Sequence, residues 1–398
     1  MFPTIGHLIN YIFSTNIIFP IPSYGVMLAS AFIVAFFVIK LELKRKEKEG
    51  LLSSYLKKVL IGKPAGFVEL SISGFFGFVL GFKLIGIVFD YSLFTISPPD
   101  YIFSLEGSFI GGIVLAAIMI YSNFRSKQKK KLKEPKWIEE EVHPYQHAAT
   151  ILFIAAISGI IGAKLFHQFE YPQDFLADPI GAIFSAGGLT FYGGLIFGTI
   201  SVLYFCKKKG ISVTQMMDVA APAILLAYAT GRVGCQLSGD GCWGVINLAF
   251  ASPEVTDGVY LAKPAWLGFM PDWIWAFNYP NNVINEGIFM PDCAGKYCYV
   301  LNEPVFPTPF YETTINGIFF LILWSIRKKI KIPGLLFAFA FIMNGFERFF
   351  IEKIRVNVKF DFLGMRVTQA EIISVCLVVV GIVLIWFFQR RYKKLKKA

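Results

Sequence analysis

The stretch "IPSYGVMLASAFIVAFFVIKLELKRKEKEG", residues 21–50, decides the fold class of this chain. Its apolar part, Ile21 to Ile39, is long enough for one helix to cross a bilayer, and a basic run follows at once. The first 39 residues contain no Lys or Arg, so the basic region that opens a cleavable signal peptide is missing. We therefore expect a retained transmembrane helix whose basic end lies in the cytoplasm.

The composition of the whole chain is typical of a polytopic membrane protein. Of the 398 residues, 55% are hydrophobic and 17% aromatic, and the mean hydropathy is +0.58. The net charge of +11 comes from short basic runs between apolar segments, as in cytoplasmic loops. After residues 40–50, these runs are "RSKQKKKLKEPK" (125–136), "KKK" (207–209), "RKKIK" (327–331) and "RRYKKLKKA" (390–398). We therefore expect membrane lipids, and no nucleic acid, as partners.

The spacing of the apolar segments predicts an all-α integral membrane protein with about nine transmembrane helices. Windows of about 18 to 22 apolar residues fall near 22–39, 66–90, 102–122, 148–169, 189–206, 214–233, 313–326, 333–352 and 370–389. All five basic runs lie in the cytoplasm if the N-terminus is outside and the C-terminus is cytoplasmic.

The one long connection between these windows, residues 235–312, is then expected to form a small periplasmic head. It contains four tryptophans, whose amphipathic rings settle at the lipid interface. Its "PDCAGKYC" places Cys293 and Cys298 in a compartment where a disulfide can form. A small disulfide loop and two free thiols are both compatible with this spacing, which is poor for a metal site.

Two helical hairpins resemble each other at an offset of 81 to 82 residues. The segments "GFKL" (81–84), "IFS" (102–104) and "SFIGGIV" (108–114) recur in order as "GAKL" (162–165), "IFS" (183–185) and "TFYGGLI" (190–196). The pattern predicts a tandem duplication, although small residues also recur in unrelated packed membrane helices. Lys83 and Lys164 are equivalent in the two copies, which favours a structural role for Lys164 at least as much as a catalytic one.

Polar residues gather at the predicted outer ends of the last helices. Asn344, Arg348, Glu352 and Arg355 fall at i, i+4, i+8 and i+11, so we expect all four on one helix face. Guanidinium groups bind phosphate in a fixed, bidentate geometry, so this face suits an anionic headgroup. The alternative is a salt-bridge cluster that only holds helices together.

A third outer arginine lies in "GRVGCQLSGDGCWG" (231–244), where five glycines make poor material for a helix in lipid. Asp240, eight residues after Arg232, is expected to pair with that arginine or to orient it. The alternative is a packed turn with a structural ion pair. A nucleotide-binding loop is not expected, because no strand precedes the glycines and their spacing differs from that of such loops.

Several segments resemble the prolipoprotein diacylglyceryl transferase family, in the order in which that family has them. They are "SYGVMLASAF" (23–32), "GAKL" (162–165), "GGLTFYGGLIFG" (187–198), "DVAAPAILLAYATGRVG" (218–234), "GRVGCQLSGDG" (231–241), "FPTPFYE" (306–312) and "RFFIEKIR" (348–355). The resemblance covers roughly residues 24–39 and 148–389, and residues 50–125 look like an inserted pair of helices.

The resemblance implies a function at the bacterial inner membrane. Members of this family move the diacylglyceryl group of phosphatidylglycerol to the lipobox cysteine of preprolipoprotein signal peptides, without a metal or other cofactor. Carried over, the resemblance implies catalytic roles for Tyr192, Arg232, Asp240, Arg348 and Glu352. It implies that the substrate contacts Arg232 again and also Tyr24, Gly193, Gly194, Tyr311, Asn344 and Arg355.

The sequence departs from the family at four of these motif positions. Tyr192 stands where the family has histidine, and Cys235, Asn344 and Phe306 replace an asparagine, a tyrosine and a histidine. Because a tyrosine is a poor base at neutral pH, the proton acceptor is open between Tyr192, His167 and a carboxylate such as Glu352 or Asp240. A divergent member with another acceptor, or a lipid or anion transporter, remains as an alternative function.

The predicted organisation has five segments. They are the first transmembrane helix and its basic loop (1–49), the inserted hairpin and a basic cytoplasmic loop (50–146), core helices with the second hairpin copy (147–234), the periplasmic head (235–312), and the C-terminal core helices with the basic tail (313–398).

Overall fold

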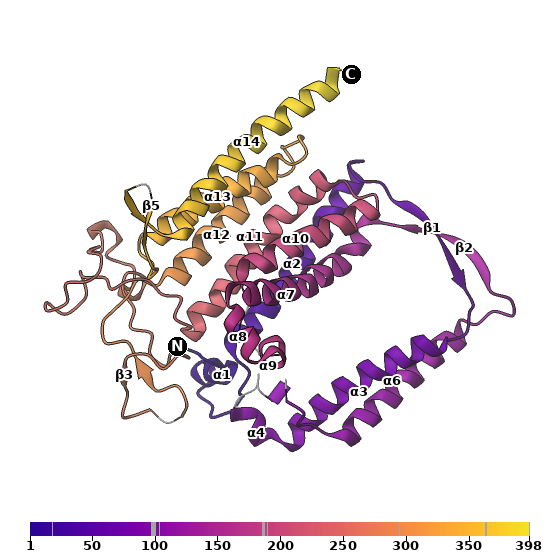
Figure 1. Cartoon of the computed structure of the whole chain (residues 1–398), viewed down its shortest axis with the longest axis horizontal. Helices are drawn as coiled ribbons and strands as arrows, with labels where there is room; N and C mark the ends of the chain where they lie inside the picture. Colours follow the sequence, from indigo (N-terminus) through magenta and orange to yellow (C-terminus); the bar gives the residue numbers. More distant parts are fainter. Residues whose placement is uncertain are drawn as a thin grey trace. The chain divides into compact units, whose positions relative to one another are not determined.

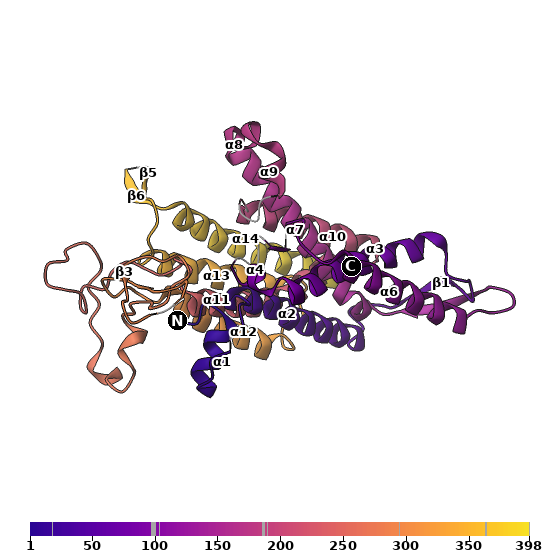
Figure 2. The same cartoon turned by 90° about the horizontal axis from the view of Figure 1, so that it is seen from below.

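The computed structural model describes residues 1–17, 19–96, 101–102, 104–184, 188, 190–293, 295–362 and 364–397 (Figures 1 and 2). Within these ranges nine helices have 18 residues or more: α2 (Ser23–Lys48), α3 (Phe67–Phe89), α6 (Phe109–Lys129), α7 (Ala148–Glu170), α10 (Phe191–Lys208), α11 (Val213–Ser238), α12 (Thr308–Ile326), α13 (Leu335–Glu352) and α14 (Gln369–Lys397). The chain divides into two compact units.

The long helices confirm a polytopic, mainly helical membrane protein. Six segments are long and apolar enough to cross a membrane, namely α2, α3, α6, α11, the N-terminal 26 residues of α14, and Pro144–Glu170, which contains α7. α10, α12 and α13 coincide with the other three apolar windows of the sequence. The number of nine spans and their orientation stay predictions.

The first unit comprises Met1–Leu52, Ala148–Leu152 and the chain from Leu203 onward. In it α11 packs against α2, α12 and α13, and α14 packs against α13 (Figure 1). The core between α11, α12 and α13 consists of Ala221, Leu225, Leu323, Leu336 and Ala340. Exposed apolar side chains such as Val379 and Trp386 lie on α14, as expected for a helix that faces lipid.

Buried polar groups connect the ends of three helices in this unit. Asp218 of α11 accepts hydrogen bonds from the backbone N–H groups of Gly334 (2.9 Å) and Phe337 (3.2 Å), which caps the start of α13. Lys46 of α2 donates to Gln215 on α11 at 2.6 Å. An ion pair between Glu42 and Arg327 joins two of the basic runs, 40–50 and 327–331. Two runs in contact must lie on the same side of the membrane, as their charges predict.

The head of this unit begins at Gly239, not at residue 235. The glycine-rich stretch after residue 230 was expected to leave the helix, but α11 continues through Arg232 and Cys235 to Ser238. A Cβ on Gly234 would lie 3.0 Å from Cβ of Met27, so this glycine permits close packing of α11 on α2. Only at Gly239, with φ 62°, does the backbone turn away from the helix.

A small aromatic core and short hydrogen-bonded segments hold the head together. The core contains Trp243, Tyr279, Leu301 and Val305. Two 3-10 turns, Ala265–Leu267 and Asp272–Ile274, and the antiparallel strands β3 (Ile288–Phe289) and β4 (Tyr299–Val300) complete it.

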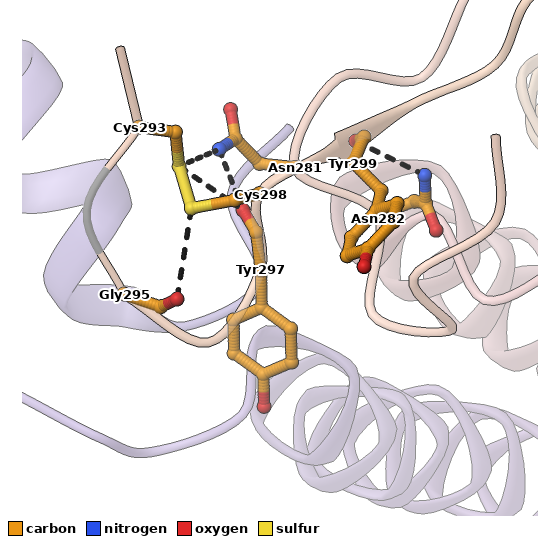
Figure 3. Close-up of a disulfide and its surroundings, with 7 residues drawn as sticks. All are labelled: Asn281, Asn282, Cys293, Gly295, Tyr297, Cys298 and Tyr299. Atoms are coloured by element: carbon orange, nitrogen blue, oxygen red, sulfur yellow. Dashed lines mark hydrogen bonds between the residues drawn. A yellow bond between two sulfur atoms is a disulfide. The ribbon is translucent and has the colours of Figure 1, made fainter. Parts of the chain in front are cut away.

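Of the two alternatives for the head cysteines, the structure has the disulfide between Cys293 and Cys298 (Figure 3). Asn281 fixes the loop by donating a hydrogen bond to the carbonyl of Tyr297 at 2.7 Å. The fully buried amide of Asn282 donates to the carbonyl of Tyr299 at 3.2 Å. These contacts tie the disulfide loop to β4.

The second unit comprises Ser53–His147 and Phe153–Val202 and contains both hairpins. Strands β1 (Tyr55–Ile61) and β2 (Lys136–Val142) form an antiparallel ribbon in which Lys57 faces Glu140 and Lys58 faces Glu139.

The shorter helices are α1 (Ile5–Phe13, in the first unit), α4 (Tyr91–Ile96), α8 (Pro172–Ala177), α9 (Pro179–Phe184) and the 3-10 turn Pro144–His147. With β5 (Phe360–Phe362) and β6 (Met365–Val367) in the first unit, three two-stranded sheets correct the expectation of an all-α fold.

The two hairpins bring equivalent glycines together. A Cβ on Gly81 would lie 2.2 Å from the carbonyl oxygen of Gly111, and a Cβ on Gly162 would lie 2.4 Å from that of Gly193. No side chain fits at these crossings, so the glycines let the helix backbones touch. The recurring sequence pattern therefore marks a recurring helix contact, which supports the proposed duplication.

The equivalent lysines also bind alike. Lys83 donates to the carbonyl oxygens of Tyr101, Ser104 and Glu106 at 2.7 to 2.8 Å. Lys164 donates to the carbonyl oxygen of Ala182, at 3.3 Å. Both ammonium groups thus satisfy backbone groups of the segment that joins the two long helices, as a structural role for Lys164 requires.

Candidate functional site

Glu312 is the centre of a buried ionic cluster in the first unit. Its carboxylate lies 2.7 Å from Nε of Arg232, 3.3 Å from Nη1 of Arg348 and 3.3 Å from Nη1 of Arg355. The hydroxyl of Tyr228 donates to it at 3.1 Å. Glu312 is fully buried, so one carboxylate gathers three guanidinium groups from separate parts of the chain.

The helices explain how Arg232 reaches this carboxylate. Tyr228 and Arg232 lie one turn apart on α11, and Nε of Arg232 is 3.3 Å from the hydroxyl of Tyr228. The segment before α12 fixes Glu312 opposite them, because Phe306 is fully buried and Thr308 donates to the carbonyl of Cys242 at 2.7 Å. The two side chains of this ion pair therefore come from packed, preorganised elements.

The other two arginines come from α13 and the segment after it. Arg348 lies 3.2 Å from Glu352, one turn later, so these two residues share one face of α13 as expected. Arg355 does not continue the helical stripe, because α13 ends at Glu352. It is placed by a β-bridge to Gly244, where a Cβ would lie 2.3 Å from the carbonyl oxygen of Ile354.

The cluster has unused capacity to bind an anion. The side chains of Arg232, Arg348 and Arg355 keep exposed fractions of 14%, 25% and 16%, whereas Glu312 has none. A guanidinium carries five N–H donors, so three of them offer more donors than one carboxylate can accept. The arrangement suits a phosphate group approaching from the accessible side.

Glu312, Tyr228 and Glu347 were missed as site residues from the sequence. Glu312 closes the quoted segment "FPTPFYE" and Glu347 directly precedes Arg348, so both carried a signal in their motif positions. Glu347 is only 3% exposed, and its carboxyl group interacts with Asn316, Arg348 and Arg232. A buried carboxyl group needs such partners, so Glu347 belongs to the same polar cluster.

The expected pairing of Asp240 with Arg232 is wrong, because the acidic partner of Arg232 is Glu312. Asp240 lies beyond the end of α11, and its carboxylate accepts a hydrogen bond from the backbone N–H of Cys242 at 3.2 Å. Cys235, Asp240 and Cys242 place their ligand atoms within 4.8 Å of one another, which makes them the one such group of possible metal ligands in the described ranges.

The remaining predicted residues of the first unit lie around these elements. Tyr24 packs against Gly234, whose Cβ would lie 3.2 Å from its ring. Tyr311 donates from its hydroxyl to the carbonyl of Ile274 at 2.6 Å, so it binds the head to α12. Asn344 is half-buried on α13, one turn before Arg348.

Tyr192, Gly193, Gly194 and His167 belong to the second unit. A Cβ on Gly193 would lie 2.3 Å from the carbonyl of Gly162, and one on Gly194 would lie 3.1 Å from that of Gly159. Both glycines therefore serve helix packing, and their role toward substrate stays a prediction. Tyr192 is 37% exposed on α10, and the ring of His167 lies 4.9 Å from that of Tyr171.

Comparison with known proteins gives the family. The family described as prolipoprotein diacylglyceryl transferase matches residues 109–387. Relatives named phosphatidylglycerol–prolipoprotein diacylglyceryl transferase include that of Enterococcus faecalis, 31% identical over 60% of this chain and 74% of the relative. That of Streptococcus uberis is 28% identical over 71% of this chain and 88% of the relative. That of Staphylococcus epidermidis is 26% identical over 62% of this chain and 75% of the relative.

The match contains all of α11, α12 and α13, and with them every residue of the Glu312 cluster. The family match and the ionic cluster thus concern the same part of the chain, and this multi-pass membrane protein belongs to the prolipoprotein diacylglyceryl transferase family.

Proposed function

We propose that this protein transfers the diacylglyceryl group of phosphatidylglycerol to the lipobox cysteine of preprolipoprotein signal peptides. The observation that carries the proposal is the convergence of Arg232, Arg348 and Arg355 on the buried Glu312. The names of the relatives supply the two substrates. We propose the bacterial inner membrane as the location, with the N-terminus and the head on the periplasmic side.

The chemistry needs a cationic site where the phosphate leaves. The acceptor thiol releases its proton to water, its sulfur attacks the glyceryl carbon that carries the phosphate oxygen, the C–S bond forms, and the C–O bond breaks. The electron pair of that bond goes to the phosphate oxygen, and glycerol phosphate departs. Arg232, Arg348 and Arg355 are held in place before the reaction by Glu312, so they stabilise the growing negative charge without reorganisation.

The family membership supports a transferase over a lipid or anion transporter. The competing proposal is a divergent family member that acts on another acceptor. It is motivated by Cys235, which lies next to the cluster and departs from the family pattern. Nη1 of Arg232 is 3.7 Å from its sulfur.

The test compares two acceptor peptides, with the full chain in phosphatidylglycerol vesicles. Phosphatidylglycerol and a lipobox peptide should yield glycerol phosphate and lipid-modified peptide in equal amounts. The same peptide with Ser in place of Cys should yield neither, because the less acidic hydroxyl is a much weaker nucleophile. Release of glycerol phosphate with the Ser peptide, or none with the Cys peptide, would contradict the proposed acceptor.

A further inference from the structure

Three side chains with metal-ligand chemistry meet just beyond the ionic cluster. Sγ of Cys235, a carboxylate oxygen of Asp240 and Sγ of Cys242 all lie within 4.8 Å of one another. Cys235 is 6% exposed, and the other two are half-buried. A short sequence, "CQLSGDGC" (235–242), therefore supplies two sulfurs and one oxygen to one small volume.

The backbone of this segment is folded to hold that arrangement. Gly239 (φ 62°) and Gly241 (φ 84°) adopt the left-handed conformation, so the chain turns back over the end of α11. The carboxylate of Asp240 accepts from the N–H of Cys242 at 3.2 Å, and Thr308 donates to the carbonyl of Cys242 at 2.7 Å. The loop is thus fixed both to itself and to α12.

The donor set suits zinc. Zn²⁺ prefers tetrahedral coordination by thiolate, imidazole and carboxylate, with Zn–S distances of about 2.3 Å. Two sulfurs on such an ion lie about 3.8 Å apart, and the sulfurs of Cys235 and Cys242 lie within 4.8 Å, so they need to approach by no more than about 1 Å. Three protein ligands leave the fourth position free, which is the pattern of catalytic rather than structural zinc sites.

The charge of the surroundings fits as well. Two thiolates, one carboxylate and one Zn²⁺ sum to one negative charge, and Arg232 contributes one positive charge. Its Nη1 lies 3.7 Å from Sγ of Cys235. Hydrogen-bond donors commonly contact the ligands of a metal and orient them, and Arg232 is such a donor to the sulfur of Cys235.

We propose that Cys235, Asp240 and Cys242 bind one Zn²⁺ ion, whose fourth position takes the sulfur of the acceptor cysteine. This rests on the proposed function. The acceptor thiol loses its proton to water on binding, because a coordinated thiol is deprotonated. Its sulfur then attacks the glyceryl carbon, and the phosphate leaves toward Arg232. The site would generate a thiolate at neutral pH in a chain that has Tyr192 at the histidine position of its family.

The first test is the metal content of the full-length protein, purified in detergent without added reductant. Elemental analysis should find about one zinc per chain in the wild type. The variants Cys235→Ser and Cys242→Ser should lose at least about nine tenths of it, since each removes one of three ligands. Cys376→Ser removes an exposed cysteine of α14 and should keep the zinc. A wild-type protein without metal, or with a Cys235–Cys242 disulfide, would overturn the proposal.

The second test asks whether the acceptor sulfur reaches the metal. Protein loaded with Co²⁺ should show sulfur-to-cobalt absorption, which should increase when a lipobox peptide with Cys is added and stay constant with the Ser peptide. An unchanged spectrum with the Cys peptide would restrict the metal to a structural role and overturn the acceptor site.

A third measurement separates this inference from the proposed function. Chelation should slow transfer at least tenfold, and one equivalent of Zn²⁺ should restore it, because the metal supplies the thiolate. A metal-free protein that transfers at the full rate would overturn the zinc site and leave the transferase intact. A zinc-loaded protein that transfers nothing from phosphatidylglycerol would overturn the transferase.

Discussion

Arg232 and Glu312 are 80 residues apart in the sequence, yet Nε of the arginine lies 2.7 Å from the buried carboxylate. The intervening chain forms the end of α11, the whole head and the start of α12. The head thus closes a long loop whose two ends meet in one ion pair. Because Arg348 and Arg355 meet the same carboxylate, Glu312 links three segments of the site.

Replacing Glu312 should destabilise the whole first unit. Glu312→Gln leaves three guanidiniums without their shared counter-charge, and breaking a buried pair costs about 3 to 5 kcal/mol. The arginines are partly exposed, so we expect the lower end of that range. Thermal unfolding in detergent measures the effect as a lower midpoint. Glu254→Gln, at an exposed position of the head, is the control that should unfold like the wild type, and equal midpoints for all three proteins would refute the central role of Glu312.

Arg348 and Glu352 should act as a unit in transfer. Their groups lie 3.2 Å apart and Glu352 is buried, so kcat/KM for Arg348→Ala, Glu352→Ala and the double variant should be non-additive by about 0.5 to 3 kcal/mol. Lys263 and Asp272 form an exposed ion pair of 2.9 Å in the head and provide the comparison. Strictly additive losses at Arg348 and Glu352 would mean that the two residues act independently.

The disulfide should stabilise the head by a moderate amount. Cys293 and Cys298 close a loop with a sequence separation of 5, for which chain entropy gives about 2 kcal/mol. A reductant should lower the unfolding midpoint of the wild type and leave that of the double variant Cys293→Ala/Cys298→Ala unchanged. An equal response of both proteins to the reductant would show that this disulfide does not stabilise the head.

The glycine crossing of the second hairpin should tolerate no side chain. In Gly193→Val the new Cβ would lie 2.3 Å from the carbonyl oxygen of Gly162, and the two methyl groups need further space. The helices must therefore separate. We expect a lower unfolding midpoint and less folded protein in the membrane. Gly317→Val is the matched control, because a Cβ on Gly317 meets nothing within 4 Å. Wild-type behaviour of Gly193→Val would remove the packing role assigned to this glycine.

Hydropathy predicted the long helices of this protein closely, because each depends on a local apolar run. The window at 214–233 ended five residues too early, however. Within the part of α11 that the window left out, Gly234 lets the helix lie against Met27 of α2. In a membrane protein a small residue marks close helix packing as readily as it marks a loop.

The site was predicted in part. The i, i+4 spacing of Arg348 and Glu352 gave their contact, since one helix turn fixes it. The partner of Arg232 was assigned to Asp240 by proximity in the sequence, and local spacing cannot reveal a carboxylate 80 residues away. Arg355 reaches the cluster through a β-bridge to Gly244, which no helical periodicity predicts.

The most direct measurement of the central claim is the mass of a lipobox peptide after incubation with the full chain and phosphatidylglycerol vesicles. The wild type should add one diacylglyceryl group to the peptide cysteine. Arg232→Gln should be slower by at least about tenfold, which corresponds to about 1.4 kcal/mol of lost transition-state binding. Arg125→Gln, at an exposed position of α6 outside the cluster, should transfer like the wild type. An Arg232→Gln protein as fast as the wild type, or a peptide that gains no lipid from any of the three, would contradict the account.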